Sequence, residues 1–191
     1  KGTGQRVSGE TCTHYLTTTK EVLDNPDFNE AAKFVCSPAL RDREDCEALW
    51  QALSDGLLTA VSSDHCGIDV AELKQAGRND FTQIPNGSPG AGDRLHMVWT
   101  EGVCTGKLTR QKFVDVIATQ PAKINGIYPR KGTLAVGSDA DVVIFDPNYE
   151  GTVHLADNPN GVDYNLYEGR RQSGRVETVL LRGQVVVENA K

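Results

Sequence analysis

The residues best suited to chemistry lie at the end of a short apolar run. Residues 57–61 are Leu, Leu, Thr, Ala and Val, a composition typical of a strand buried on both faces, and Ser-Ser-Asp-His follows at 62–65. A carboxylate and an imidazole at the C-terminal end of a buried strand are expected in the active site of an α/β barrel. The alternative is that Asp64 only caps the following turn, as Asp often does. From these residues alone both interpretations stay open.

A second apolar run ends in a similar way. Residues 31–36 read Ala, Ala, Lys, Phe, Val and Cys, which predicts a strand, and Ser37 and Pro38 follow it. Proline lacks a backbone N–H and biases the preceding residue toward an extended conformation. We therefore expect the backbone of Ser37 to be free to meet a ligand.

The longest stretch without helical or strand periodicity covers residues 67–93. Its centre, 84–92, reads Ile-Pro-Asn-Gly-Ser-Pro-Gly-Ala-Gly and predicts an irregular loop around Asn86. A loop of this length in a compact domain is usually functional, although a plain surface loop is the alternative. It is not a phosphate-binding loop, because the terminal Gly-Lys-Ser/Thr of that motif is absent.

The elements that must position these groups follow a βα pattern. A helix is predicted between Asp42, which fits an N-cap, and Gly56, which is placed to end it. Apolar residues at i, i+3, i+4 and i+7 form its buried face, and these are Cys46, Leu49, Trp50 and Leu53. The order strand, helix, strand from residue 34 onward predicts a parallel sheet. Residues 11–20 read as a loop after a first strand.

The later part of the chain changes character. Helices are predicted over residues 94–102 and after Thr109, which fits an N-cap. Beyond 128–132 the patterns are those of strands, at 141–147, at 153–155, and in a hairpin over 176–188. We expect an all-β unit that begins near Pro129.

Composition excludes several classes of function. The chain has 191 residues, 38% hydrophobic and 24% charged, so it can form a globular core, and its net charge of −6 argues against a nucleic-acid surface. It contains no apolar run long enough for a membrane span and no signal peptide. Five cysteines at scattered spacings indicate neither a disulfide framework nor a self-contained zinc module. A reducing cytoplasm is the expected setting.

Taken together, the motifs resemble the C-terminal half of dihydropyrimidinases and D-hydantoinases. The segments that carry this resemblance occur in the family's order, at residues 9–12, 37–41, 62–66, 84–90 and 128–132. Residues 137–143, Gly-Ser-Asp-Ala-Asp-Val-Val, resemble the strand that returns the chain to the small sandwich domain of cyclic amidohydrolases. That last motif is widely shared, whereas the Pro-Asn-Gly loop together with the Ser-Asp-His strand end is more specific.

The resemblance implies a fold and an activity. The fold is α/β, with the C-terminal part of a (β/α)8 metal-dependent hydrolase barrel in residues 1–128 and part of a small β-sandwich domain in residues 129–191. The activity is hydrolytic ring opening of 5,6-dihydropyrimidines or 5-substituted hydantoins to N-carbamoyl amino acids. The complete enzyme would hold two zinc ions and form a homo-oligomer, a tetramer, with no nucleic-acid or membrane partner.

The resemblance also implies roles for three residues. Asp64 matches the aspartate that ligates the more buried metal and acts as acid and base. Ser37 and Asn86 match positions whose backbone groups hold the cyclic amide. A metal-bound hydroxide needs a group that takes its proton and returns it to the leaving nitrogen, and a carboxylate beside the metal can do so.

Two departures from the family pattern matter. Ala39 stands where the family often has a second proline. The family's His-x-His pair, its carboxylated lysine, two further metal histidines and an oxyanion-stabilising tyrosine have no match here, and none of the four histidines fits them. We therefore expect the chain to be a fragment that is inactive alone.

Other family members remain as alternatives. Dihydropyrimidinase-like scaffold proteins share the fold and most of the motifs without the metal site, but they lack a carboxylate at the position of Asp64 and read Pro-Glu-Gly at the position of Asn86. This chain keeps both residues, which favours an enzyme. Allantoinase and dihydroorotase are weaker alternatives, similar mainly in the Glu-Thr-Cys and Asp-Ala-Asp segments.

Overall fold

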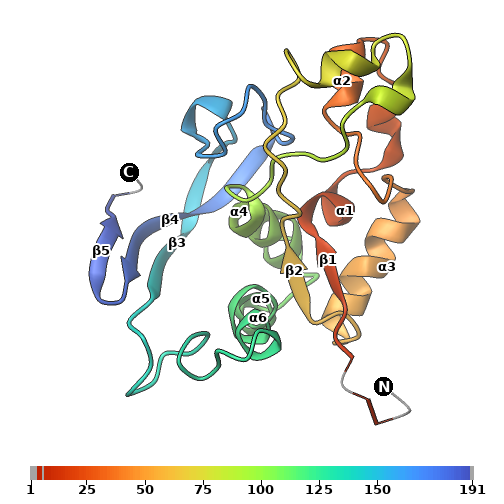
Figure 1. Cartoon of the computed structure of the whole chain (residues 1–191). Coiled ribbons are helices and arrows are strands. Elements are labelled where there is room, and N and C mark those ends of the chain that lie inside the picture. The colour runs from red at the N-terminus through yellow and green to blue at the C-terminus, as the bar shows by residue number, and fades with distance from the viewer. Residues whose placement is uncertain (1–3, 6, 190–191) are drawn as a thin grey trace.

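A computed structural model describes residues 4–5 and 7–189, and within them the chain is an α/β structure with two sheets (Figure 1). The first sheet is a parallel pair formed by β1 (Glu10–Cys12) and β2 (Ala60–Ser62). The second sheet is antiparallel, and its strands in spatial order are β3 (Val142–Thr152), β4 (Arg171–Leu181) and β5 (Gln184–Val187).

Helices fill the space around and between the two sheets. The earlier ones are α1 (Thr13–Thr17), α2 (Phe28–Ala32) and α3 (Arg43–Ser54), with a 3-10 turn η1 (Lys20–Asp24). The later ones are α4 (Arg94–Val98), α5 (Arg110–Val114) and α6 (Gln120–Ile124), with π-helical turns η4 (Trp99–Val103) after α4 and η5 (Asp115–Thr119) between α5 and α6. In Figure 1 the helices α4, α5 and α6 lie between the antiparallel sheet and the parallel pair.

The helix α3 confirms the prediction between Asp42 and Gly56. The N–H of Asp42 donates to the Asp45 carboxylate at 3.2 Å, the return contact of a capping box. On the predicted apolar face, Cys46, Trp50 and Leu53 are buried and Leu49 is half-buried. Trp50 also donates its indole N–H to the carbonyl of Leu16 at 2.9 Å. This contact ties α3 to α1 and so fixes the connection that brings β2 beside β1.

The helices predicted after residue 94 are also confirmed. Thr109 caps α5, because its hydroxyl accepts from the N–H of Lys112 at 3.1 Å. Pro121 lies in the first turn of α6, and the helical run from α5 through η5 to α6 continues past it. The N–H that Pro121 lacks falls at the junction of the π-helical turn η5 and α6, where the hydrogen-bond ladder changes its spacing.

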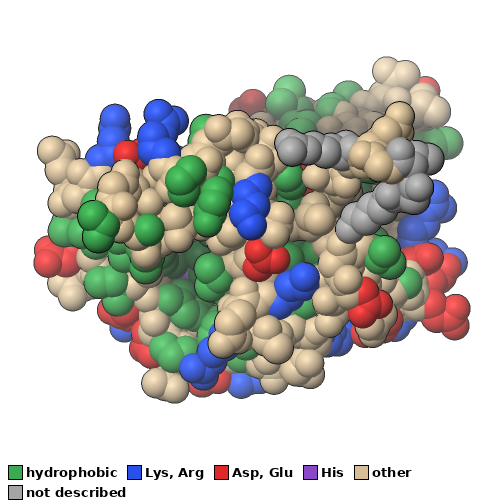
Figure 2. All heavy atoms as spheres, turned by 90° about the horizontal axis from the view of Figure 1, so that it is seen from below, with side chains coloured by type: hydrophobic (Ala, Val, Ile, Leu, Met, Phe, Trp, Pro, Cys, Tyr) green, Lys and Arg blue, Asp and Glu red, His purple; other side chains and the backbone are tan. Residues whose placement is uncertain are grey.

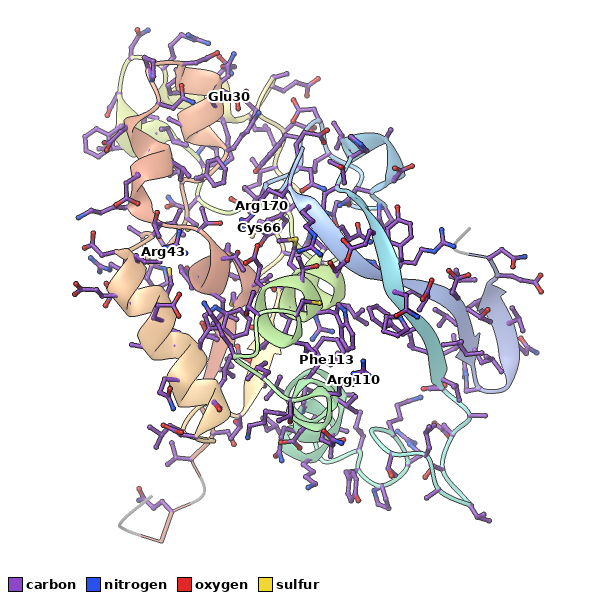
Figure 3. The ribbon with its side chains drawn as sticks, turned by 180° about the vertical axis from the view of Figure 1, so that it is seen from behind. Glu30, Arg43, Cys66, Arg110, Phe113 and Arg170 are labelled. Carbon is purple, nitrogen blue, oxygen red and sulfur yellow. The ribbon has the colours of Figure 1, made fainter. Side chains whose placement is uncertain are left out.

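An aromatic cluster joins these helices to the antiparallel sheet. The ring of Trp99 meets Phe113 edge-on at 5.3 Å and Phe145 of β3 at 4.9 Å between centroids. Phe113 and Arg110 belong to α5, and both contact the ring of Trp99 (Figure 3). Aromatic edge-to-face pairs contribute beyond the area that they bury, so this cluster is a major link between the two halves of the chain.

The predicted strand over residues 31–36 is wrong. The chain forms α2, ending at Ala32, and then a turn. The Asp27 carboxylate accepts from the N–H of Asn29 at 2.8 Å and caps this helix, and Ala31 and Ala32 favour helix. The apolar run reflects burial of Ala32 and Cys36 against neighbouring segments rather than strand pairing.

Two other expectations are corrected. Residues 11–20 form the end of β1, the helix α1 and the start of η1 instead of a loop. Burial outweighs the low helix propensity of threonine here, and Thr17 donates its hydroxyl to the carbonyl of Thr13 at 2.8 Å. Residues 153–155 do not form a strand, because the chain turns into η6 (Leu155–Asp157). The strand at 141–147 and the final hairpin are confirmed as β3, β4 and β5.

The antiparallel sheet leaves apolar side chains exposed. Val143 and Ile144 of β3 and Val185 and Val186 of the edge strand β5 are about half exposed. Hydrophobic side chains are also exposed across the face seen in Figure 2. An unpaired edge with apolar neighbours is a site where chains associate.

We expect residues 1–191, expressed alone, to self-associate through this sheet. Replacing Val185 by Lys should shift the chain toward the monomer in size-exclusion chromatography with light scattering, because it removes an exposed apolar side chain from the edge strand.

The neighbouring variant Gln184→Lys is the matched control, since it adds the same charge without removing an apolar side chain. Equal effects of the two variants would show that charge alone governs association.

Candidate active site

A cavity of 490 Å³ lies beside β1 and the C-terminal end of β2. It contains two of the three predicted site residues, Asp64 and Ser37. The other lining residues are Glu10, Thr11, Cys12, Tyr15, Pro38, Ala39, Arg41, Asp45 and Leu49. A larger cavity of 850 Å³, between the α5–α6 run and β3, includes none of the predicted residues and is lined mainly by apolar side chains. We assign the smaller cavity as the candidate site because it brings the reactive groups together.

Asp64 has an unusual backbone conformation. It follows β2 by two residues and has φ 49°, in the left-handed region, which Asp tolerates better than most residues. The side chain is exposed, and none of the hydrogen bonds or ion pairs within the described residues uses its carboxylate. A turn-capping Asp would bind a nearby N–H, so the interpretation of Asp64 as a cap has no support here. Such outliers cluster at functional sites.

Three buried groups near Asp64 are held neutral. Burial raises the pKa of the Cys12 and Cys36 thiols, and the charge of Asp64 raises both further. Burial lowers the pKa of His14, and the nearby charge of Asp64 acts in the opposite direction. Near neutral pH the side chains of Cys12, Cys36 and His14 are therefore uncharged.

Ser37 and Asn86 lie against each other. The hydroxyl of Ser37 donates to the side-chain oxygen of Asn86 at 3.0 Å, although the two residues are 49 positions apart. Both are exposed, and of the two only Ser37 lines the cavity. Ser37 follows a turn instead of the predicted strand, and its peptide bond to Pro38 is cis. The structure thus brings all three predicted residues to one region.

The loop after β2 is irregular, as predicted, apart from the 3-10 turns η2 (Lys74–Gly77) and η3 (Phe81–Gln83). It returns alongside the strand end, where the N–H of Cys66 donates to the carbonyl of Ser88 at 3.0 Å. Cys66 marks this strand end in Figure 3. The ring nitrogen Nδ1 of His65 accepts from the N–H of Gly90 at 3.3 Å.

Sequence reasoning missed Tyr15 as a member of the site. Its hydroxyl donates to the carbonyl of Pro38 at 2.8 Å, and burial raises its pKa, so the phenol stays protonated. The misassigned loop at 11–20 hid this residue. The signal that could have found it is its position three residues after Cys12, one helical turn beyond the end of β1.

The described residues do not complete a metal site. No group of three or more His, Cys, Asp or Glu side chains among residues 4–5 and 7–189 is placed to hold a metal ion. Asp64 is the single predicted ligand, and one carboxylate is too few donors for a protein-bound zinc. Every helix in the same part of the chain is too short or too polar to cross a bilayer.

Comparison with known proteins defines the class. Residues 4–186 match the amidohydrolase family, and the chain therefore belongs to that family. It is 49% identical to a D-hydantoinase of Ralstonia pickettii over 98% of this chain and 41% of that protein. It is 40% identical to a dihydropyrimidinase of Arabidopsis thaliana over 97% of this chain and 35% of that protein. These findings confirm the resemblance inferred from the motifs.

Solved structures agree with the sequence relatives. A dihydropyrimidinase from Brevibacillus agri NCHU1002 superimposes with a TM-score of 0.96 at 46% identity, over 100% of this chain and 41% of that one. An L-hydantoinase from Arthrobacter aurescens superimposes with a TM-score of 0.89 at 33% identity, over 100% of this chain and 41% of that one. The chain thus spans about two fifths of the length of these relatives.

The packing of Gly87 yields a prediction about this site. Gly87 has φ 122°, and a Cβ there would lie 2.5 Å from the Cβ of Cys66. Gly87→Ala should therefore lower the free energy of unfolding of the whole protein by about 1–3 kcal/mol, the usual cost of overpacking, measured by thermal denaturation.

Gly106→Ala is the control, because Gly106 also has a positive φ, 77°, but has no atom within 4 Å of an added Cβ. If Gly87→Ala instead raised KM for a cyclic amide at unchanged stability, the glycine would serve ligand approach rather than packing.

Proposed function

We propose that the whole protein opens the ring of cyclic amides by hydrolysis, converting 5,6-dihydropyrimidines or 5-substituted hydantoins to N-carbamoyl amino acids. The observation that carries this proposal is the unpaired Asp64 carboxylate, which lines a cavity with Ser37. The names of the relatives support the substrate class. The presence of Asp64 and Asn86 argues against the scaffold alternative.

Ser37 and Asn86 would bind the flat ring. A cyclic imide offers alternating carbonyl oxygens and N–H along one edge, so backbone donors and acceptors can hold it without charged side chains. The exposure of both residues and the 3.0 Å contact between their side chains support a shared binding role.

Asp64 would move the proton. During hydrolysis a C–O bond forms at the attacked carbonyl and the ring C–N bond breaks. The carboxylate accepts a proton as water attacks and returns it to the leaving nitrogen, so the net reaction adds one water.

We include two zinc ions in the whole protein, with Asp64 as one ligand and the others outside the described residues. Bound zinc would polarise the attacked carbonyl and lower the pKa of bound water. The strands β1 and β2 pair in parallel, and α3 lies between them in the sequence, which supports a barrel part in residues 1–128. The antiparallel sheet supports a sandwich part in residues 129–191. We also propose that the whole protein is cytoplasmic and forms a homo-oligomer, a tetramer.

The decisive variant is Asp64→Asn in the whole protein. Asn tolerates the left-handed backbone, so folding should persist while the proton carrier is lost. We expect kcat for dihydrouracil to fall by about 10²–10⁴-fold, the usual contribution of a general acid–base group.

Asp24→Asn is the matched control, since Asp24 is an exposed acid outside the cavity wall. A near-normal kcat for Asp64→Asn, with circular dichroism unchanged, would remove Asp64 from the mechanism.

A second expectation concerns metal retention. Because the described residues offer one predicted ligand, residues 1–191 alone should not retain stoichiometric zinc in equilibrium dialysis and should not hydrolyse dihydrouracil. Tight stoichiometric zinc together with turnover would show that this chain holds a complete site.

A further inference from the structure

Lys74 is a fully buried lysine whose role the mechanism above does not assign. Its side chain has 0% exposure at the start of η2. No acidic side chain forms an ion pair with it in the part of the chain that the structure describes. Lysine is almost never buried without a partner, so the cost of burial must be offset locally. Burial lowers the pKa of Lys74 to about 8.

Three backbone carbonyls supply the compensation. The ammonium donates to the carbonyl of Ala32 at 2.8 Å, to that of Gly87 at 2.8 Å, and to that of Val35 at 3.4 Å. An ammonium has three protons, so each proton has one acceptor. The acceptors come from two separate segments, the end of α2 with the turn that follows it, and the loop after η3.

These two segments carry the proposed substrate-binding residues. Gly87 is the neighbour of Asn86, and Val35 precedes Ser37 by two residues. Further contacts join the segments, from the N–H of Gly87 to the carbonyl of Val35 at 3.0 Å and from Ser88 Oγ to the carbonyl of Lys33 at 2.7 Å.

The three carbonyls depend on Lys74 unequally. The carbonyl of Ala32 also accepts from the N–H of Val35, and that of Val35 accepts from the N–H of Gly87. Among the described residues, the Gly87 carbonyl has Lys74 as its only donor. Removing the ammonium would leave this buried carbonyl unsatisfied, which is costly enough to displace the loop that bears Asn86.

We propose that Lys74 is a positioning residue for the cyclic amide: by binding the carbonyls of Ala32, Val35 and Gly87 it fixes the spacing between the Ser37 and Asn86 backbones. This inference rests on the proposed function. Lys74 does not touch the substrate. It sets the distance between the two binding segments, and therefore how well they match the imide edge.

The test is Lys74→Met in the whole protein, because methionine has similar length and lacks the ammonium. Misplaced binding groups weaken the ground state and the transition state alike, so KM for dihydrouracil should rise about tenfold or more, while kcat changes much less. An unchanged KM in the folded variant would overturn the proposal.

Leu53→Ala is the control for a general loss of stability. Leu53 is fully buried in α3 and belongs to neither binding segment. It should lower Tm and leave KM unchanged. If Leu53→Ala raised KM as much as Lys74→Met does, any loss of stability would have this effect, and the proposed positioning role would be refuted.

If Lys74→Met does not fold, Lys74→Gln decides, because its shorter, neutral side chain has two amide protons for the three carbonyls. A KM rise in that variant supports the positioning role, and an unchanged KM overturns it. The proposed function is judged separately, on the parent protein. Absence of turnover there would refute the proposed function, whereas turnover with unchanged KM in the variants would refute only the inference about Lys74.

Discussion

The parallel pairing of β1 with β2 is the constraint on which the site depends. It joins Cys12 to Ser62 across fifty residues of sequence and places the end of each strand at the same edge. The connection is held by Trp50, which binds the carbonyl of Leu16, and by Arg94, whose guanidinium donates to the carbonyl of Val61 at 2.8 Å. Without these contacts two strands of three residues each would not persist, since so short a pair is marginal in water.

The cavity at this edge combines charged side chains at its rim, Asp64 among them, with buried neutral groups. The thiols of Cys12 and Cys36 and the imidazole of His14 are kept uncharged chiefly by burial. The substrate-binding positions are likewise neutral, because they use backbone groups. Backbone groups at Ser37 and Asn86 suit an uncharged ring, since they can pair with its imide edge without an ionic contact.

The antiparallel sheet is joined to this edge through side chains distant in sequence. Trp99, Phe113 and Phe145 pack together across the helices, and Asp93 accepts hydrogen bonds from three asparagine side chains of the segment 158–165. A buried carboxylate is stable only when its hydrogen bonds all form. The Asp93 contacts therefore also specify how the segment 158–165 packs against the start of α4.

The sequence by itself determined the features that local rules control. The helix capped at Asp42, the helix capped at Thr109, the final hairpin and the irregular loop around Asn86 follow from caps, periodicity and turn residues. Motif resemblance singled out Asp64, Ser37 and Asn86 as the candidate site. Only the tertiary structure decided that residues 31–36 are not a strand, that Thr13–Thr17 is a helix, and that Ser37 meets Asn86. It also decided the environment of Lys74. Those outcomes depend on burial and on acceptors supplied by remote segments, and local propensity is too weak to predict them.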